Sequence, residues 1–341
     1  MSEFTPLLRA LVARADIGGD DMRAAVGAIM DAEWSSAQAG AFLTALAMKG
    51  ETPSEVIGAA SAMRERSLHV EHDRALVADV CGTGGDNAHT INVSTCVGFV
   101  VAGAGVPVAK HGNRAASSKC GSADVLEALG LHIDAPPDDA RMHLERHNFA
   151  FLFAQRYHPA MKAVGPVRRE LGVRTVFNVL GPLTNPARAT HQVIGVASIA
   201  HLELVGEALR GLGGRAGAVV HAASGIDEVD GEAPTHVYQF DDTGVRRWML
   251  DPADFGIHAP RAAIAGGDAT HNAAALVAIL RGERSPRADV IAINAALAFV
   301  VAERAGALDE GLQIARDVMA SGAALEAFEA ARRPSAEADK R

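Results

Sequence analysis

Residues 1–70 carry apolar side chains at intervals of three and four positions, which is the spacing of one buried helix face. The segment "TPSE" (52–55) predicts a helix start, because Thr52 and Glu55 match a capping box and Pro53 suits the first helical position. We therefore expect a small helical domain over residues 1–72. The apolar residues at helical spacing include Phe42, Leu43, Leu46 and Ala47.

From residue 75 the pattern changes to short apolar runs, rich in β-branched residues, that alternate with stretches of helical spacing. This alternation is typical of β-α-β units around a parallel sheet. The runs are "ALVADV" (75–80), "VPVAK" (106–110), "FAFLFA" (149–154), "HQVIGVAS" (191–198) and "GAVVHA" (217–222). The helical stretches lie near residues 95–104, 122–129, 138–147 and 200–212.

The C-terminal third predicts two additions to this sheet. The runs "THVYQF" (235–240) and "VRRWML" (245–250) predict a pair of antiparallel strands, and residues 268–333 return to helical spacing. A chain of 341 residues also exceeds the roughly 250–300 at which one hydrophobic core stops growing. The predicted fold class is α/β, with a larger domain over residues 73–341 whose central, mostly parallel sheet is flanked by helices.

Composition and charge exclude several classes of protein. The formal net charge of −9 argues against a general nucleic-acid surface, because non-specific binding depends on clustered Lys and Arg. No apolar stretch approaches the roughly 18 residues of a membrane span, and no signal peptide is visible. Cys81, Cys96 and Cys120 match neither metal-ligand spacing nor a disulfide framework, so a cytoplasmic location is expected.

The segment "DVCGTGGD" (79–86) contains three glycines in four positions, directly after an apolar run. In open α/β sheets, ligands bind beyond the carboxyl ends of strands, and a glycine-rich turn before a helix presents N–H groups to an anion. A dinucleotide fingerprint would require glycine where Asn87 stands, and no P-loop sequence occurs. The expected occupant is a phosphate or pyrophosphate group, and neither NAD nor ATP is favoured.

Two further segments follow predicted strands and add charge to the same edge of the sheet. The segment "KHGNRAASSK" (110–119) is cationic and rich in hydroxyl groups, which favours a phosphorylated ligand over a solvated loop. The segment "GIDEVD" (225–230) supplies paired carboxylates. Because Mg²⁺ usually takes one or two carboxylates together with substrate phosphates and water, we favour a magnesium site over an acidic surface turn.

Five motifs, in this order and at these separations, closely resemble the anthranilate phosphoribosyltransferase family. They are "GTGGD", "NVST", "KHGNRAASSKCGSADVLEALG", "HPAMKAVGPVRRELGVRTVFNVLGPLTNP" and "GIDEVD". The resemblance covers essentially the whole chain. It implies transfer of a phosphoribosyl group from 5-phosphoribosyl 1-pyrophosphate to anthranilate, with two Mg²⁺ ions per active site. It also implies homodimers formed through the small helical domain, which helices around residues 160–190 are expected to join.

The resemblance assigns roles to individual positions of this sequence. Ser94, Asp227 and Glu228 are expected to hold metal: Ser94 and Glu228 one ion, and Asp227 with Glu228 the other. Anthranilate is expected to contact Gly82, His111, Asn113, Tyr157, His158 and Arg168. The residues expected to bind phosphoribosyl pyrophosphate are Gly82, Gly84, Gly85, Asp86, Thr90, Asn92, Val93, Ser94, Thr95, Lys110, His111, Gly112, Asn113, Arg114, Ala115, Ala116, Ser117, Ser118 and Ser122.

No general base is assigned, because an aromatic amine conjugated to a carboxylate is already unprotonated at neutral pH and positioning can suffice. His111 is the candidate if a base is needed. Two other functions remain open at this level. A pyrimidine nucleoside phosphorylase shares the architecture, although the acidic pair in "IDEVD" and the segment "VRRELG" argue against it. A non-catalytic relative that binds nucleic acid would require a basic groove, which a charge of −9 disfavours.

Overall fold

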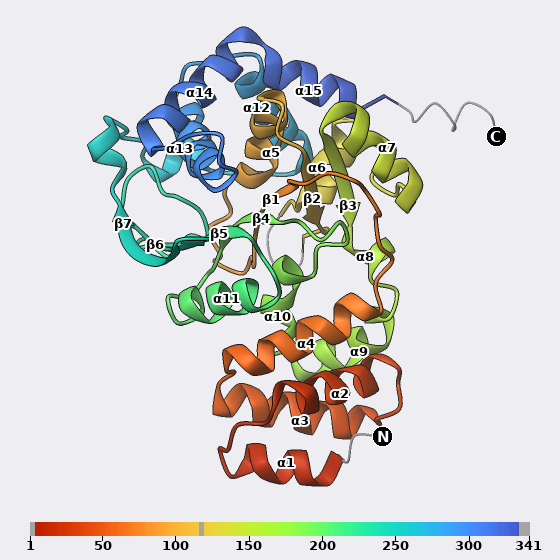
Figure 1. Cartoon of the computed structure of the whole chain (residues 1–341). Coiled ribbons are helices and arrows are strands. Elements are labelled where there is room, and N and C mark those ends of the chain that lie inside the picture. The colour runs from red at the N-terminus through yellow and green to blue at the C-terminus, as the bar shows by residue number, and fades with distance from the viewer. Residues whose placement is uncertain (1–3, 116–118, 334–341) are drawn as a thin grey trace, which may run out of the picture.

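The computed structural model of the chain describes residues 4–115 and 119–333, so Ala116, Ser117 and Ser118 of the expected ligand set lie outside the described residues. The N-terminal part is a bundle of helices at one end of the molecule (Figure 1). Its helices are α1 (Phe4–Val12), α2 (Gly19–Met30), α3 (Ser36–Lys49) and α4 (Pro53–Glu65). Within the described part of the chain, no helix has the length and apolar character needed to cross a membrane.

Local sequence signals account for the start and the buried face of these helices. The capping box at the start of α4 is confirmed: Thr52 Oγ1 accepts from Glu55 N at 3.3 Å, and Glu55 Oε2 accepts from Thr52 N at 2.8 Å. Phe42 and Leu46 are fully buried, whereas Ala47, on the same expected face, is exposed. Of the four residues that helical spacing placed on the buried face, three lie in the core and Ala47 does not.

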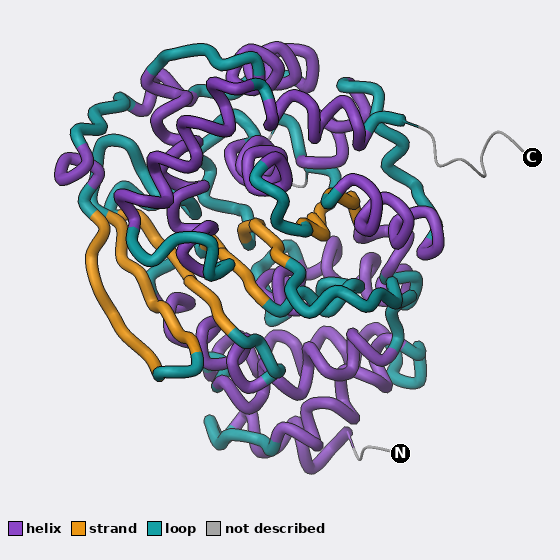
Figure 2. The backbone as a smooth tube through the Cα atoms, turned by 45° about the horizontal axis from the view of Figure 1, so that its top comes forward, coloured by secondary structure: helices purple, strands orange, loops and turns teal. Residues whose placement is uncertain are grey.

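A seven-stranded sheet with the order β3-β2-β1-β4-β5-β6-β7 forms the centre of the larger part (Figure 2). The first five strands in this order are parallel, and β6 and β7 are antiparallel additions, as the sequence predicted. The strands are β1 (Ala78–Gly82), β2 (Val108–Gly112), β3 (Phe149–Phe153), β4 (His191–Gly195), β5 (Ala216–Ala222), β6 (Thr235–Asp241) and β7 (Gly244–Leu250).

Helices cover both faces of the sheet, and successive strand residues point to opposite layers because the strand period is two. On β4, Val193 belongs to the core formed with α5 and the C-terminal helices, while Ile194 belongs to the core shared with α11 and the N-terminal bundle. On the face that contains Ile194, α11 (Ala200–Gly211) packs with the N-terminal bundle, and α7 (Pro137–His147) packs on β3. The layer that contains Val193 is formed by α5 (Val93–Gly103), α6 (Ser122–Ala128), α12 (Ala269–Leu280), α13 (Pro286–Val301), α14 (Leu308–Ser321) and α15 (Ala323–Ala331).

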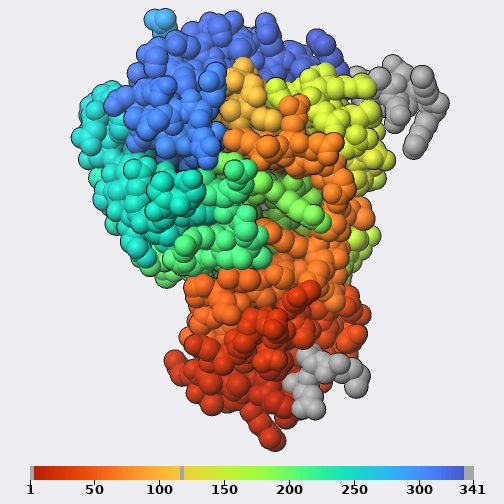
Figure 3. All heavy atoms as spheres, viewed as in Figure 1, coloured from red at the N-terminus to blue at the C-terminus, as the bar shows by residue number. Residues whose placement is uncertain are grey.

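Between β3 and β4 the chain returns to the bundle. There α9 (Met161–Leu171) packs against α2 and α3, as Figure 1 shows, and it is followed by the short helix α10 (Phe177–Leu180). Arg64 of α4 ties the two parts together, since its guanidinium donates to the carbonyl oxygens of Leu183 at 2.8 Å and Leu212 at 3.1 Å. Figure 3 shows the bundle, in red and orange, as the narrower part beneath the α/β part.

Candidate active site

A cleft of about 1110 Å³ lies at the carboxyl ends of β1 and β2, bounded by α9, α10 and the segment 225–230 after β5, here called the acidic loop. Most of the ligand-binding residues expected from the sequence line it, although they come from segments far apart in the chain. They are Gly82, Gly84, Gly85, Asp86, Thr90, Asn92, Ser94, Thr95, Lys110, His111, Gly112, Asn113, Arg114, Ala115, Ser122, His158, Arg168, Asp227 and Glu228.

Two of the expected residues within the described chain do not line the cleft. Tyr157 is fully buried, and its hydroxyl group donates to the carbonyl oxygen of Ala135 at 3.0 Å. Val93 is buried at the start of α5, with its N–H bonded to the carbonyl oxygen of Ile91. The family resemblance placed Tyr157 close to anthranilate together with His158, but of these two residues, at the end of the short helix α8 (Ala154–Tyr157), only His158 lines the cleft.

The floor of the cleft forms where β1 and β2 separate. Strand β1 is in register with β4 from Ala78 to Gly82, but its register with β2 is limited to the pair of Ala78 and Val108. The gap is bridged by side chains: Asp79 Oδ1 accepts from the N–H of His111 at 3.3 Å, and Asn185 Nδ2 donates to Asp79 Oδ2 at 2.8 Å.

Asp79 and Asn185 were not singled out by the sequence reasoning, although a carboxylate inside the apolar run "ALVADV" is a visible anomaly. Asn185 Nδ2 also donates to the carbonyl oxygen of Ala109 at 2.7 Å, so one amide links both separated strands. Burial raises the pKa of Asp79 to about 6, and the nearby ammonium of Lys110 acts in the opposite direction. Together these two side chains fix the strand ends from which Lys110 and His111 project.

Lys110 places a buried cation on this floor. Its side chain is almost completely enclosed, and Nζ donates to the carbonyl oxygen of Val80 at 2.7 Å and to Ser94 Oγ at 3.2 Å. Burial lowers the pKa of Lys110, while the nearby carboxylate of Asp79 raises it. An ammonium group has three N–H donors, so one remains for a ligand oxygen.

The segment 82–85, here called the glycine turn, has a structural role that the sequence reasoning did not foresee. Gly84 and Gly85 have φ of 64° and 79°, which glycine adopts without steric cost. The N–H of Gly84 donates to Asp227 Oδ2 at 2.8 Å, and a Cβ at Gly82 would lie 2.4 Å from the same oxygen. On β4, a Cβ at Gly195 would lie 1.4 Å from the main-chain oxygen of Asp227. The absence of a side chain at Gly82 and Gly195 therefore leaves the space that Asp227 of the acidic loop occupies.

Three carboxylates converge beside this turn. The N–H of Asp227 donates to Asp86 Oδ2 at 3.4 Å, and burial together with the Asp86 carboxylate raises the pKa of Asp227 to about 7. Burial and both neighbouring carboxylates hold the pKa of Glu228 well above its ordinary value. Glu228 Oε2 is buried and has no hydrogen-bond partner among residues 4–115 and 119–333. A buried carboxylate without a partner is costly unless a cation or donor reaches it.

This donor set fits Mg²⁺. Among residues 4–115 and 119–333, no three His, Cys, Asp or Glu side chains form a closed metal cluster. A closed cluster is not required, because Mg²⁺ usually takes one or two carboxylates and completes its shell with substrate phosphates and water. Asp227, Glu228 and the hydroxyl group of Ser94 are the groups that would hold it, next to the glycine turn.

His111 and His158 form a buried pair on the opposite side of the cleft, with 3.2 Å between their Nε2 atoms. His111 Nδ1 lies 3.0 Å from the carbonyl oxygen of Gly181, which can only accept, so Nδ1 carries the proton. His111 Nε2 then accepts from His158 Nε2–H. Burial lowers the pKa of His111 to about 4. The lone pair of His111 is occupied, which argues against a general-base role for this residue.

We expect the two neutral histidines to make the protein acid-sensitive. Burial lowers the pKa of both rings, so below about pH 6.5 the unfolded chain binds protons that the folded protein does not, and the free energy of unfolding falls as pH falls from about 6.5 toward 4. The slope contributed by each ring approaches about 1.4 kcal/mol per pH unit. His158→Gln, whose amide can still donate to His111, should reduce this slope in urea unfolding at pH 7, 5.5 and 4.5.

The control for this experiment is His258→Gln, at an exposed histidine outside the cleft. Equal slopes in wild type and His158→Gln would show that the buried pair is not held neutral.

Cationic side chains line the wall of the cleft that α9 provides. Arg168 lies with its guanidinium carbon 5.9 Å from the ring centroid of Phe177, and burial lowers its pKa. Arg174, in the loop after α9, donates to the carbonyl oxygen of Gly85 at 3.3 Å and so reaches across to the glycine turn. Both arginines line the cleft, so an anionic ligand bound there would lie near two cations.

Arg114, expected to bind phosphate, is engaged elsewhere in this structure. Its guanidinium forms ion pairs with Asp124 at 3.0 Å and Glu127 at 2.8 Å, both on α6. Asp124 Oδ2 also accepts from the N–H groups of Ala115 and Gly121, each at 2.9 Å. This carboxylate therefore holds Ala115 and Gly121 close together.

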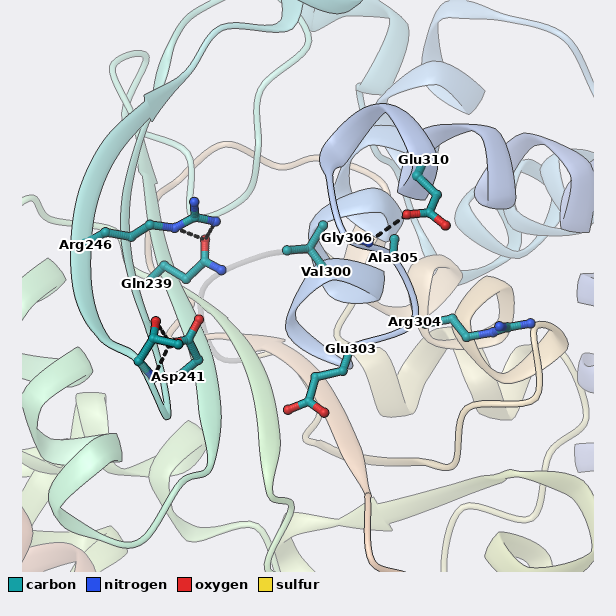
Figure 4. Close-up of a pocket in the computed structure, with 10 residues that line it drawn as sticks. Gln239, Asp241, Arg246, Val300, Glu303, Arg304, Ala305, Gly306 and Glu310 are labelled. Carbon is teal, nitrogen blue, oxygen red and sulfur yellow. Dashed lines mark hydrogen bonds between the residues drawn. The ribbon is translucent and has the colours of Figure 1, made fainter.

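A second, open pocket of about 610 Å³ lies between the β6–β7 hairpin and the connection from α13 to α14 (Figure 4). Its charged residues have both signs, and several are paired with near neighbours. Arg246 donates to Gln239 at 2.8 and 3.2 Å, and the N–H of Gly306 donates to Glu310 at 2.7 Å. The pocket contains none of the residues discussed above, and its paired charges do not converge on a common ligand position.

Comparison with known proteins identifies the relatives of this fold and cleft. Residues 74–325 match the model described as "Glycosyl transferase family, a/b domain", and residues 5–67 match "Glycosyl transferase family, helical bundle domain". Anthranilate phosphoribosyltransferase of Herpetosiphon aurantiacus is 48% identical over 91% of this chain and 93% of its own.

Solved structures agree with these matches. The crystal structure of anthranilate phosphoribosyltransferase from Thermus thermophilus is 42% identical, with a TM-score of 0.90 over 95% of this chain and 97% of its own. The enzyme from Saccharomyces cerevisiae in complex with PRPP and Mg is 26% identical, with a TM-score of 0.88 over 96% of both chains.

Proposed function

This chain belongs to the anthranilate phosphoribosyltransferase family, and we propose that its reaction takes place in the cleft at the carboxyl ends of β1 and β2. The enzyme transfers the phosphoribosyl group of 5-phosphoribosyl 1-pyrophosphate to anthranilate, which gives N-(5-phosphoribosyl)anthranilate and pyrophosphate. This is the second step of tryptophan biosynthesis from chorismate. The phosphorylase and nucleic-acid-binding alternatives have no support among these relatives.

The observation that carries the placement of the reaction is the meeting of opposite charges in one cleft. The buried ammonium of Lys110 lines this cleft beside the glycine turn. So does Glu228, whose buried Oε2 has no partner within the part of the chain that the structure describes. A pyrophosphate with bound magnesium complements both, since its oxygens suit Lys110 and its metal suits Glu228. A relative solved with PRPP and Mg supports this ligand.

We assign two magnesium ions, one to Ser94 with Glu228 and one to Asp227 with Glu228. Bound magnesium would supply Lewis-acid stabilisation of the departing pyrophosphate. The chain's own part is to hold these oxygens converged and to donate from Lys110 Nζ toward the leaving group, where negative charge develops. Formation of phosphoribosyl-anthranilate, followed by its fluorescence with and without Mg²⁺, tests the proposal directly; product formation at the same rate without a divalent ion would overturn it.

No general base is required for this reaction. The amino group of anthranilate already presents a lone pair, so orientation of the acceptor matters more than proton removal. We place the acceptor's carboxylate against Arg168, because a guanidinium fork matches a carboxylate in two parallel hydrogen bonds. Gly82, Asn113, His111 and His158 line the same cleft, with both histidines neutral.

Arg168→Ala is expected to raise the KM for anthranilate by about 10-fold to 100-fold, because a charge-assisted hydrogen bond is worth roughly 1.5–3 kcal/mol. The KM for phosphoribosyl pyrophosphate should change much less. Steady-state kinetics with each substrate varied in turn measure both values. Arg169→Ala is the matched control, since Arg169 also lines the cleft on α9. If Arg168→Ala raised both KM values equally, the arginine would act on the helical bundle instead of the acceptor.

We also propose a homodimer formed through the helical bundle. Val12 of α1 and Met48 of α3 are each 70% exposed, and these two helices pack against each other. Apolar side chains this exposed on neighbouring helices favour burial against a second copy.

A cytoplasmic location is proposed from the metabolic role. All three cysteines are buried, which suits a reducing compartment.

A further inference from the structure

A side chain from a distant helix anchors the acidic loop after β5. Asn294, in the middle of α13, forms two hydrogen bonds with the main chain of Val229, the residue directly after Glu228. Val229 N–H donates to Asn294 Oδ1 at 2.9 Å, and Asn294 Nδ2 donates to the carbonyl oxygen of Val229 at 2.8 Å. The amide thus pairs with one residue of the loop as a neighbouring strand would.

Asn294 is an exception on its helix. Apart from this residue, the buried positions of α13 between Val290 and Phe299 are apolar. A buried amide in such a setting is costly unless its donors and acceptor are satisfied. Here they are satisfied, because the second hydrogen of Nδ2 is donated to the carbonyl oxygen of Val290 at 2.9 Å. The polar side chain therefore has a specific partner, and that partner is the acidic loop.

The same helix supports the loop at a second point. A Cβ at Gly231 would lie 2.7 Å from Val290 Cγ2 and 2.6 Å from Ala259 Cβ. The main chain directly after the acidic loop is therefore in close contact with α13. Gly231 O accepts from the N–H of Ala259 at 2.8 Å. On the other side of Glu228, Asp227 is held by the glycine turn through Gly84 N–H. Glu228 thus lies between two fixed segments of main chain.

This anchoring opposes a repulsive force. The carboxylates of Asp86 and Asp227 are held around the glycine turn, where Asp86 Oδ2 accepts from Asp227 N–H at 3.4 Å and Asp227 Oδ2 accepts from Gly84 N–H at 2.8 Å. Glu228 is the next residue after Asp227. Like charges gathered in this way favour moving apart when no cation lies between them. We propose that Asn294 is a positioning residue that keeps Glu228 and Asp227 converged for the divalent cation and pyrophosphate. It touches neither ligand, and it acts by fixing the main chain of Val229. The inference rests on the proposed function of the acidic loop.

The test uses two substitutions of Asn294 and one control on the same helix. Asn294→Ala removes all three hydrogen bonds, and Asn294→Asp keeps the shape and the acceptor but loses both donors. Leu297→Ala, one turn further along α13 and fully buried, controls for general loosening of the helix. Hydrogen exchange of the Val229 amide is measured in the full-length, metal-free protein. The Mg²⁺ concentration for half-maximal activity, and Mn²⁺ binding by electron paramagnetic resonance with phosphoribosyl pyrophosphate present, are then compared.

Both Asn294 variants are expected to exchange the Val229 amide faster, and to need about 10-fold to 100-fold more Mg²⁺ and Mn²⁺, the usual loss when a partner of a metal ligand is removed. Activity should recover at saturating Mg²⁺, and Leu297→Ala should change neither quantity. If Asn294→Ala does not fold, the isosteric Asn294→Asp decides the question. Unchanged cation requirement in the Asn294 variants would overturn the inference, whether or not exchange is faster. A wild-type enzyme that needs no divalent ion would instead overturn the proposed function.

Discussion

Replacing Asp227 by Asn together with Glu228 by Gln is expected to lower kcat by at least about 10²–10³-fold, the usual cost of one preorganised electrostatic contact. The amides keep the shape of both side chains but lose the charge that holds a divalent cation. The folded protein should be no less stable than wild type, because burial already disfavours both charges. Turnover at saturating substrates and a melting curve without metal measure the two effects.

Glu232→Gln is the matched control for this double variant. Glu232 lies two residues beyond the acidic loop and is exposed, and its carboxylate accepts from the N–H of Arg261 at 3.1 Å. Its replacement should leave turnover unchanged. Wild-type activity in the Asp227 and Glu228 double variant would remove the metal assignment, because no other pair of carboxylates is assigned to the metal in this cleft.

Gly195→Ala is expected to lower turnover by about 10²-fold or more, the scale of loss when a reacting group is displaced by about 1 Å. The added methyl group would lie 1.4 Å from the main-chain oxygen of Asp227, a distance that cannot be relieved by rotating a side chain. The acidic loop or the end of β4 must move. Because φ at Gly195 is not positive, the effect comes from this contact and not from backbone strain.

Gly105→Ala separates the two effects. Gly105 has φ of 85°, and no atom of the described residues lies within 4 Å of an added Cβ, so its replacement strains the main chain without a collision. It should lower stability, by about 1 kcal/mol, and leave turnover unchanged. Steady-state kinetics and thermal melting of both variants make the comparison. Gly195→Ala with wild-type turnover would mean that the position of Asp227 is not critical for catalysis.

Local rules in the sequence were enough to predict the strands and most of the helices of this fold, while the helices around residues 160–190 were expected only from the family resemblance. The change from helical spacing to short β-branched runs located the strands, and the order of the runs predicted a parallel sheet with two antiparallel additions. The glycine turn, the segment from Lys110 and the acidic pair were recognisable because their chemistry is carried by residues adjacent in the chain. The carboxyl ends of parallel strands then brought these segments to one edge.

Only the tertiary structure decided which side chains hold those groups in place. Asp79 and Asn185 bridge two separated strands, Gly195 leaves room for Asp227, and Asn294 pairs with Val229. Each of these contacts joins residues 32 to 106 positions apart, and nothing in a local pattern specifies such a partner.

The same limit explains why Tyr157 lies apart from its expected position. Tyr157 is adjacent to His158 in the chain, but it lies in the core with its hydroxyl group on Ala135, while His158 reaches His111. The sequence by itself determined the strands, the helices and the chemical groups of the cleft, since these depend on neighbouring residues. Packing between distant segments determined their orientation and protonation, since burial and hydrogen-bond partners exist only in the folded chain.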